Sequence, residues 1–344
     1  MDREELKQQT NKRSKMKKNL FIAIAFILLL GCSSQKENFK KEVIDGITFI
    51  YNSDIEFSEI TLESELIIDL DEIDEDEHFF KSLNFVTENN EGEIFITDNS
   101  KDEISVFSYD GKYKKSFGSN GKGPGEFDDI GNIAFFQNGD MIVSDIGNYR
   151  YQVLDKNGNF LYSNKENNIP IEVIVDNKDC IITSPSMFGI PIEKGSPLIS
   201  IYDRKFDLIK NIDEMEAKDA LSYGFFQGYY QIAKKSGNDV VVSSFIDNWI
   251  KIYKRNKLIT QIDRVLPYKT KPLKSRILKK GHHFVDYQSI SMDVSVDSEG
   301  ILIKKIPLYE IKVTNFYIGK DNKIYLYDRY DRDKLAVIRY KAVL

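Results

Sequence analysis

Short apolar runs alternate with turn-forming residues along most of the chain. The clearest examples are "EGEIFITDNSKDEISVFSYDGKY" (91–113) and "NGDMIVSDIGNYRYQVLDKNGNF" (138–160), which match at a constant offset of 47 residues. Glycine turns such as "NEGE" and "QNGD" separate the apolar runs, because glycine accepts the positive φ that tight turns require. Each unit therefore predicts four short antiparallel strands. Repetition of such a unit every 40–50 residues or so predicts an all-β fold, a β-propeller.

Fainter copies of the unit continue to the C-terminus. They are "NKDCIITS" with "SIYDRKFDLIKNI", "GNDVVVSS" with "WIKIYKRNKLITQI", "DSEGILIKK", and "KDNKIYLYD" with "KLAVIRYK". We therefore expect six blades of four antiparallel strands, with blade five truncated or rearranged because only 23 residues separate Gly300 from Lys323.

The last copy ends at Leu344, before its outermost strand. A propeller pairs the two ends of its chain and so leaves no raw sheet edge. We expect an N-terminal segment, either "GITFIYN" or "ELIIDL" (65–70), to supply the missing strand and close the ring.

The first residues have the pattern of an export signal. The apolar run "LFIAIAFILLL" (20–30) follows the basic "NKRSKMKK" and is too short for a membrane-spanning helix, which needs about twenty residues. The residues Leu29-Leu30-Gly31-Cys32 resemble the lipobox of bacterial lipoproteins. This resemblance implies a signal peptide at 1–31, lipid attachment at Cys32, a tether at 32–43 and a β-propeller domain at 44–344. The alternative is an ordinary signal peptide with an accidental cysteine.

Charge and cysteine content limit the partners. Hydrophobic residues make up 41% and charged residues 30% of the 344-residue chain, as in globular proteins. Removal of residues 1–31 takes away seven basic and three acidic residues and changes the net charge from −6 to −10. This balance argues against nucleic-acid binding. If Cys32 carries lipid, Cys180 has no partner for a disulfide and is most simply a buried apolar residue.

The blade pattern, with "GSNGKGPGEF" before it, resembles NHL-type repeats. It is most similar to the six-bladed β-propeller lipoproteins of Bacteroidetes, in which "G-x-G-P-G-E-F/Y" commonly joins one blade to the next. The resemblance covers 82–163 strongly and implies a fold and a location in the cell envelope rather than a reaction. The first unit departs from it, with "DNSKDE" where the second has "DIGNYR".

Neither nucleotide-binding motif fits the glycine-rich stretch. A Walker loop needs Ser or Thr after Gly-Lys, and Gly121-Lys122 is followed by Gly123. The spacing G-x-G-x-G also fails the dinucleotide pattern. We interpret the stretch as a connection that turns sharply between two blades.

A metal-dependent or hydrolytic centre has little support. The three histidines, His78, His282 and His283, lack metal-ligand spacing, so a zinc site and a Ser-His-Asp triad are both disfavoured. No cofactor is expected. A calcium ion on the propeller axis remains an option because aspartates are plentiful, although no matching set of Glu and Asn completes such a site.

Topology predicts where a ligand binds. The loop between the second and third strands of a blade lies on the same face as the connection to the next blade. Asp145 has a structural alternative, because its carboxylate could cap backbone amides of its own loop. The predicted ligand-binding rim consists of Asp98, Lys122, Glu126, Asp145, Asn148, Arg150 and Asp328.

Two functions from different classes are consistent with these features. The favoured one is a non-catalytic binding or scaffolding module, a monomer that recognises an envelope protein or glycan. The alternative is an enzyme with a propeller-centred metal, lactonase-like or lyase-like. The residues "SSQKE" after Cys32 lack an acidic run associated with surface export, which favours the periplasmic side of the outer membrane over the cell surface.

Overall fold

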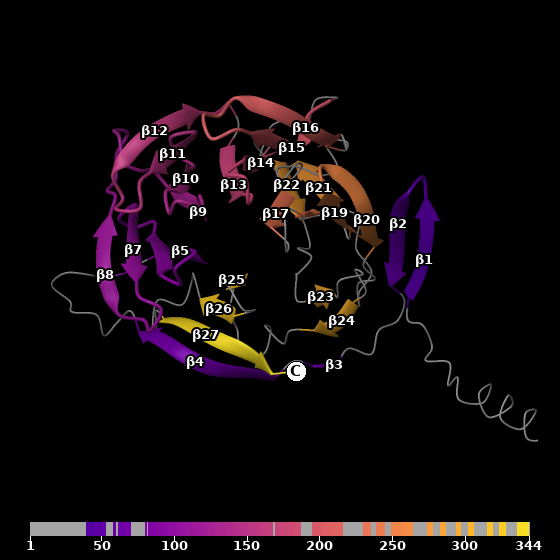
Figure 1. The fold of residues 1–344 in the computed structure, drawn as a ribbon, viewed down its shortest axis with the longest axis horizontal. Coiled ribbons are helices and arrows are strands. Elements are labelled where there is room, and N and C mark those ends of the chain that lie inside the picture. The colour runs from indigo at the N-terminus through magenta and orange to yellow at the C-terminus, as the bar shows by residue number, and fades with distance from the viewer. Residues whose placement is uncertain are drawn as a thin grey trace, which may run out of the picture. The chain divides into compact units, whose positions relative to one another are not determined.

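The computed structural model describes much of the chain between residues 39 and 343. The described ranges are 39–52, 58–59, 61–69, 80, 82–167, 169–186, 195–215, 230–234, 239–244, 249–263, 274–277, 283–286, 294–296, 302–305, 315–318, 323–327 and 336–343. The chain divides into two units, 1–40 and 41–344, and only Phe39 and Lys40 of the first are described. The second unit contains almost all of the labelled strands (Figure 1).

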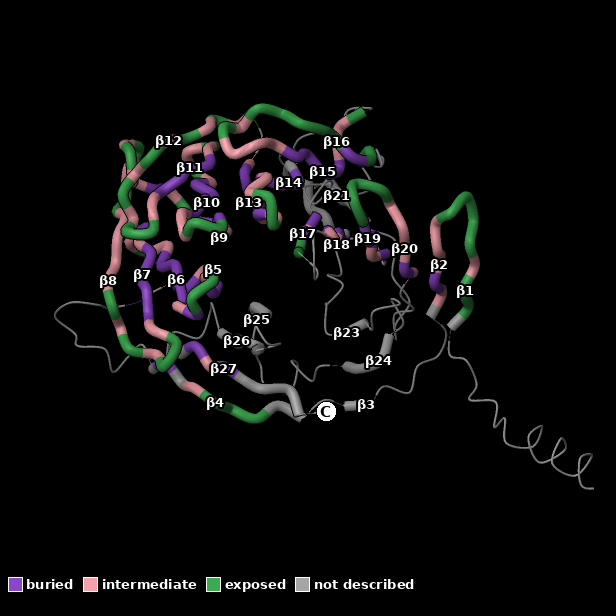
Figure 2. Tube along the Cα trace, in the orientation of Figure 1, coloured by how far each residue is buried: buried purple, intermediate pink, exposed green. Residues whose placement is uncertain are grey.

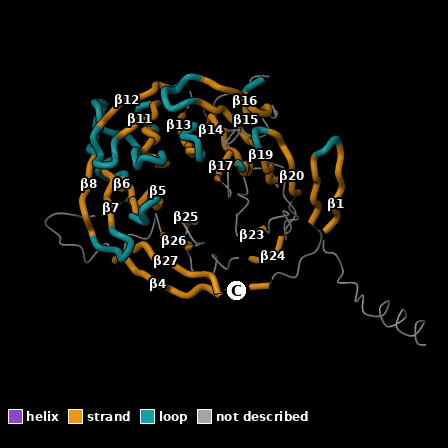
Figure 3. The backbone as a smooth tube through the Cα atoms, in the orientation of Figure 1, coloured by secondary structure: helices purple, strands orange, loops and turns teal. Residues whose placement is uncertain are grey.

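Antiparallel sheets of four strands build most of this unit. Among the described residues there are strands and loops but no helix (Figure 3), and hence no helix long and apolar enough to cross a membrane. Two consecutive sheets are the most completely described. The first has the order β5 (Leu83–Glu88), β6 (Ile94–Asp98), β7 (Glu103–Phe107) and β8 (Tyr113–Phe117), and the second β9 (Ile130–Phe135), β10 (Met141–Asp145), β11 (Arg150–Leu154) and β12 (Phe160–Lys165).

The strand registers of these two sheets repeat at the offset seen in the sequence. Asp98 pairs with Glu103 in the first sheet, and Asp145 pairs with Arg150 in the second. Gly139 has a φ of +88° in the turn before β10, where a side chain would be strained. The hairpins predicted from the repeat are therefore confirmed.

Three further sheets continue the pattern. Their orders are β13 (Ile169–Val175), β14 (Ile181–Ser186), β15 (Pro197–Tyr202), β16 (Leu208–Glu214); β17 (Tyr230–Lys234), β18 (Val240–Ser244), β19 (Trp249–Lys254), β20 (Lys257–Asp263); and β25 (Asn315–Ile318), β26 (Lys323–Tyr327), β27 (Ala336–Val343), β4 (Thr61–Asp69). The first strands of successive sheets touch: β5 contacts β9, β9 contacts β13, and β13 contacts β17. The last sheet contacts the first through β25 and β5.

The core lies between neighbouring sheets. One apolar cluster joins Phe95 and Val106 of the first sheet to Ile133 and Val143 of the second, all at most 3% exposed. Figure 2 shows the consequence: β10 and β11 are buried, while the outer strand β12 alternates between partly buried and exposed residues. Burial of apolar side chains against both neighbours is what stabilises a sheet in this arrangement.

An N-terminal strand completes the last sheet, as the sequence predicts. β4 contains most of "ELIIDL" and pairs antiparallel with β27, with Ile68 opposite Val337. The other candidate, "GITFIYN", lies in β2 (Ile47–Asn52), which pairs in parallel with β20 and follows β1 (Phe39–Ile44). β1 begins inside the segment that the sequence assigns to the tether.

The region between the fourth and last sheets lies mostly outside the described residues, so the truncation or rearrangement of blade five stays a prediction. Its described strands form a pair, β21 (Lys274–Ile277) with β22 (His283–Asp286), and a three-stranded sheet of β23 (Val294–Val296), β24 (Leu302–Lys305) and β3 (Ser58–Glu59).

Candidate functional site

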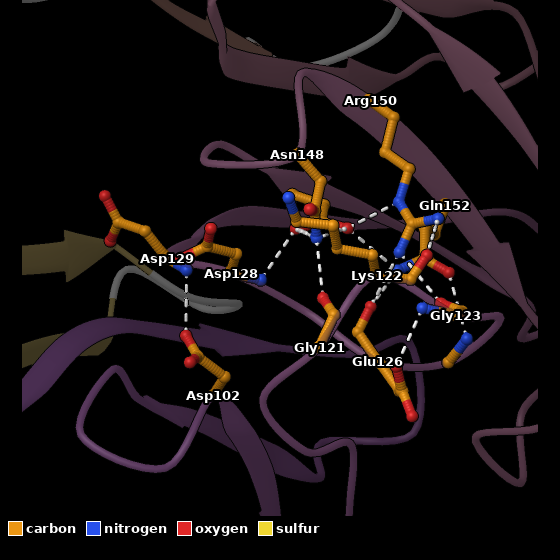
Figure 4. A network of polar contacts seen from close by, with 12 residues as sticks. Asp102, Gly121, Lys122, Gly123, Glu126, Asp128, Asp129, Asn148, Arg150 and Gln152 are labelled. Carbon is orange, nitrogen blue, oxygen red and sulfur yellow. Dashed lines mark hydrogen bonds and ion pairs between the residues drawn. The ribbon is translucent and has the colours of Figure 1, made fainter.

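The candidate site lies where the connection between the first two sheets meets the turn between β10 and β11. Asn148, in that turn, donates from Nδ2 to the carbonyl oxygen of Gly121 at 2.8 Å. Figure 4 shows side chains of the second sheet directed at the connection, which we call the connector (residues 118–129). The structure therefore brings together Lys122, Glu126, Asp145, Asn148 and Arg150, five of the seven predicted rim residues.

Asp145 is a fully buried carboxylate at the centre of this contact. Its Oδ1 accepts the backbone N–H of Asp128 at 2.9 Å, and Asn148 donates to both carboxylate oxygens. Its Oδ2 pairs with Arg150 Nε at 2.6 Å and accepts from Gln152 Nε2 at 3.0 Å. Such a set of donors satisfies the carboxylate within the protein, so the structure favours the capping role of Asp145 over direct ligand contact.

Arg150 holds the connector by its backbone. Its guanidinium donates to the carbonyl oxygens of Lys122 at 3.0 Å, Gly123 at 2.9 Å and Glu126 at 2.9 Å. Gln152 adds a bond from Nε2 to the same Glu126 carbonyl and accepts the N–H of Gly125 through Oε1. Sequence reasoning missed Gln152, although its place two residues after Arg150 on the same strand face is the available signal.

The glycines of the connector make room for Glu126. Glu126 Oε2 accepts the backbone N–H of Gly123 at 2.7 Å. A Cβ atom at Gly121 would lie 2.1 Å from that same oxygen, and φ of Gly121 is +157°. Glu126 therefore folds back under its own loop, and the interpretation of the stretch as a sharp turn agrees with the structure.

Two of the exposed side chains at this contact are large, those of Lys122 and Tyr149. Lys122 is exposed and contributes only its carbonyl oxygen to the contacts above. Tyr149 is 45% exposed, with a φ of +53° that is uncommon outside glycine. Sequence reasoning missed Tyr149. We call Lys122, Asn148 and Tyr149 the rim surface.

Asp98 plays a similar capping role in the first sheet. It is 2% exposed, and its Oδ1 accepts the backbone N–H groups of Ser82 and Ser100 at 3.2 and 2.8 Å. A small cavity beside it is lined by Phe80, Asp98, Lys101, Glu103 and Ser105. Asp328 and Cys32 lie outside the described residues.

Metal binding finds no support in the described part of the chain. Among these residues, no group of three or more His, Cys, Asp or Glu side chains is placed to hold a metal ion. Asp102, next to the candidate site, is committed to hydrogen bonds from the N–H of Asp129 at 2.8 Å and from Asn120 Nδ2 at 2.6 Å.

The four-stranded sheets, packed through their first strands and completed by an N-terminal strand, define a β-propeller. Residues 68–148, which run from the end of β4 through the first sheet to the turn after β10, match the family DUF5128, described as a 6-bladed beta-propeller. No curated protein sequence matches the chain.

Among the solved structures to which the chain is similar, two from Bacteroides share this architecture. A crystal structure of a presumed exported protein from Bacteroides fragilis aligns with a TM-score of 0.59 at 13% identity, covering 86% of this chain and 100% of that one. A member of the DUF4221 family from Bacteroides vulgatus aligns with a TM-score of 0.52 at 12% identity, covering 83% and 99%. A virginiamycin B lyase from Staphylococcus aureus aligns at 0.48 with 13% identity, covering 83% and 100%. At these identities the likeness concerns the fold alone.

Proposed function

We propose that this protein is a lipid-anchored binding module of the cell envelope that recognises a protein or a glycan through the rim surface. The observation that carries the proposal is the fixed connector. Arg150 and Gln152 occupy three backbone carbonyls of residues 122–126, so the loop is held before any ligand arrives. A loop that is already ordered loses less conformational entropy on binding.

The exposed side chains fit this role. Tyr149 offers a large and amphipathic contact surface, and Lys122 offers an exposed ammonium group.

A crosslinking pull-down from envelope extracts, run beside a glycan array, tests the rim surface. We expect Tyr149→Ala combined with Lys122→Glu to lose the captured partner or glycan. The matched control is Leu161→Ala, because Leu161 on β12 is also 45% exposed but lies outside the rim surface. Equal capture by both variants would overturn the assignment of the rim surface.

The envelope location has its own test. The lipobox-like residues before Cys32 support a lipid anchor, and the lack of an acidic run in "SSQKE" after Cys32 favours the periplasmic side of the outer membrane. We expect Cys32→Ser to move the protein from the membrane fraction to the soluble one. Loss of the wild-type protein when intact cells are treated with protease would contradict the periplasmic orientation. The enzyme alternative is tested on the same purified protein by metal analysis.

A further inference from the structure

A second polar constellation lies where the first strands of three successive sheets meet. Glu172 is on β13, which contacts both β9 and β17. Its carboxylate accepts Asn132 Nδ2 at 3.4 Å, with Oε2 as acceptor, and also accepts the backbone N–H of Ile232. Asn132 is on β9 and Ile232 on β17, so one carboxylate reaches all three inner strands.

The strand registers place a second amide at the equivalent position of β17. Ile133, Val173 and Ile232 face equivalent partners on the second strands of their sheets and are at most 6% exposed. Each belongs to an apolar cluster between neighbouring sheets. The residues immediately before them are therefore equivalent and face away from those clusters. These residues are Asn132, Glu172 and Gln231, all only partly buried.

Glu172 has no counter-charge among the described residues. Burial raises the pKa of its carboxyl group to about 7, opposed only by the hydrogen bonds from Asn132 and Ile232, and no charged side chain contributes. A partly buried carboxylate in this situation is stabilised by a positive charge that arrives from outside.

We propose that Glu172, with the amide side chains of Asn132 and Gln231, binds one ammonium group, carried by a lysine side chain or a small primary amine. An ammonium group has three donors and no acceptor, which suits one carboxylate and two amide oxygens. Turning the Asn132 amide exchanges its donor for its acceptor, because the two ends are similar in shape. The net charge of −10 without residues 1–31 also favours a basic ligand.

A single ammonium matches the site better than a divalent cation. Ca²⁺ takes six to eight oxygen ligands and gains affinity with the number of carboxylates. Glu172 supplies one carboxylate, and no group of three acidic, His or Cys side chains occurs among the described residues. The proposal goes beyond the rim surface and does not depend on it.

Saturation-transfer NMR with Nα-acetyl-lysine methylamide tests the proposal directly. The norleucine derivative, which has a methyl group in place of the aminomethyl end, is the control ligand. We expect a saturation-transfer signal for the lysine derivative only. Glu172→Gln keeps the shape of the side chain but removes its charge, and binding should weaken about tenfold, as for loss of a charge-assisted hydrogen bond.

Glu166→Gln is the matched control variant. Burial also raises the pKa of Glu166, and Asn164 Nδ2 donates to its carboxylate at 2.7 Å, but Glu166 lies outside the inner strands. Binding should be unchanged in this variant. Equal binding by Glu172→Gln and the wild type, or no binding by a wild type with a normal melting curve, would overturn the proposal. So would stabilisation by 10 mM CaCl₂ that Glu172→Gln abolishes, because the ligand would then be a divalent cation.

Failure of this proposal is distinguishable from failure of the rim surface. If the Tyr149→Ala, Lys122→Glu variant loses its captured partner but still binds the lysine derivative, both the rim surface and the Glu172 site stand. Loss of the lysine signal in the rim variant, with Glu172→Gln unaffected, would move the basic site to the rim and refute the assignment to Glu172.

Discussion

Replacement of Arg150 by Met removes the side chain that connects the connector to the second sheet. The guanidinium donates to the carbonyl oxygens of Lys122, Gly123 and Glu126 and pairs with Asp145. Met keeps much of the apolar stem but leaves all four acceptors without this donor. We therefore expect both a loss of stability and release of the connector.

The size of the stability loss depends on how deeply Asp145 and Arg150 are buried. The side chain of Asp145 is fully buried and that of Arg150 is 15% exposed. Removal of one partner from a buried pair costs about 3–5 kcal/mol, because the other charge is left uncompensated. Asp145 keeps donors from Asn148, Gln152 and the N–H of Asp128, so we expect the lower end, about 3 kcal/mol. With a urea m-value of about 3 kcal/mol per molar, the midpoint falls by about 1 M.

Urea unfolding followed by the fluorescence of Trp249 measures this loss, since Trp249 is the single tryptophan and is 8% exposed. Trypsin supplies a local readout, because release of the connector exposes the bond after Lys122. Lys114→Met is the control: its ammonium pairs with Glu93 but the side chain is 46% exposed, and such pairs contribute at most about 1 kcal/mol. If the two variants lose the same stability and the bond after Lys122 stays intact in both, the connector is not held by Arg150.

Three further changes test other parts of the structure. The pKa of Glu172 is raised from 4.5 to about 7, so the stability associated with its neutral form is present below pH 4.5 and is lost as the pH rises through 7. The loss of unfolding free energy is up to about 3 kcal/mol. Glu172→Gln should therefore flatten the dependence of urea midpoints on pH between 5 and 8. Gly158→Ala should destabilise the protein by about 2 kcal/mol or more, because its Cβ would lie 2.5 Å from the ring of Phe117. Gly139→Ala carries backbone strain alone and should cost about 1 kcal/mol. Equal urea midpoints for the two variants would refute the steric argument. Ile68→Asp places a charge in β4 at a position that is 3% exposed. It should lower the melting temperature by 5 °C or more, roughly the effect of 2–3 kcal/mol in a domain this large. An unchanged melting temperature would mean that β4 does not complete the last sheet.

Repetition made the fold predictable. The offset of 47 residues anticipates that Asp145 pairs with Arg150 as Asp98 pairs with Glu103, and the missing outer strand anticipates that one of two N-terminal segments pairs with the last strand, which β4 does. The hairpin prediction rests on local patterns, because strand periodicity and turns are encoded within a few residues, whereas the closing strand follows from the need to leave no raw sheet edge. No sequence pattern indicated the parallel pairing of β2 with β20.

The candidate site was predicted less completely, because side-chain direction depends on contacts between distant segments. The sequence placed Arg150 on the rim but did not show that its donors turn inward to the carbonyls of the connector. It also gave no reason to single out Glu172, whose partners lie 40 and 60 residues away on other sheets. The three-dimensional arrangement decides which polar side chains are hydrogen-bonded inside the protein and which remain exposed to solvent.

In the second and fourth sheets, the third strand contacts the preceding segment of the chain through different side chains. Ser105, Gln152 and Lys251 are opposite equivalent residues of their second strands, Ile96, Val143 and Val242. Gln152 binds the preceding connector through its Glu126 carbonyl.

Lys251 instead donates to Asp213 Oδ2 at 3.1 Å, and Tyr253 donates to the same carboxylate oxygen. Asp213 lies near the end of β16, where the third sheet leads into the fourth, and has a φ of +57°. The corresponding residue of the first sheet is Gly118, one residue after Phe117, with a φ of +95°. The left-handed backbone at this point is thus shared by the first and third sheets, while the residue that adopts it differs. The residue at this point can therefore be Gly or Asp without loss of the turn.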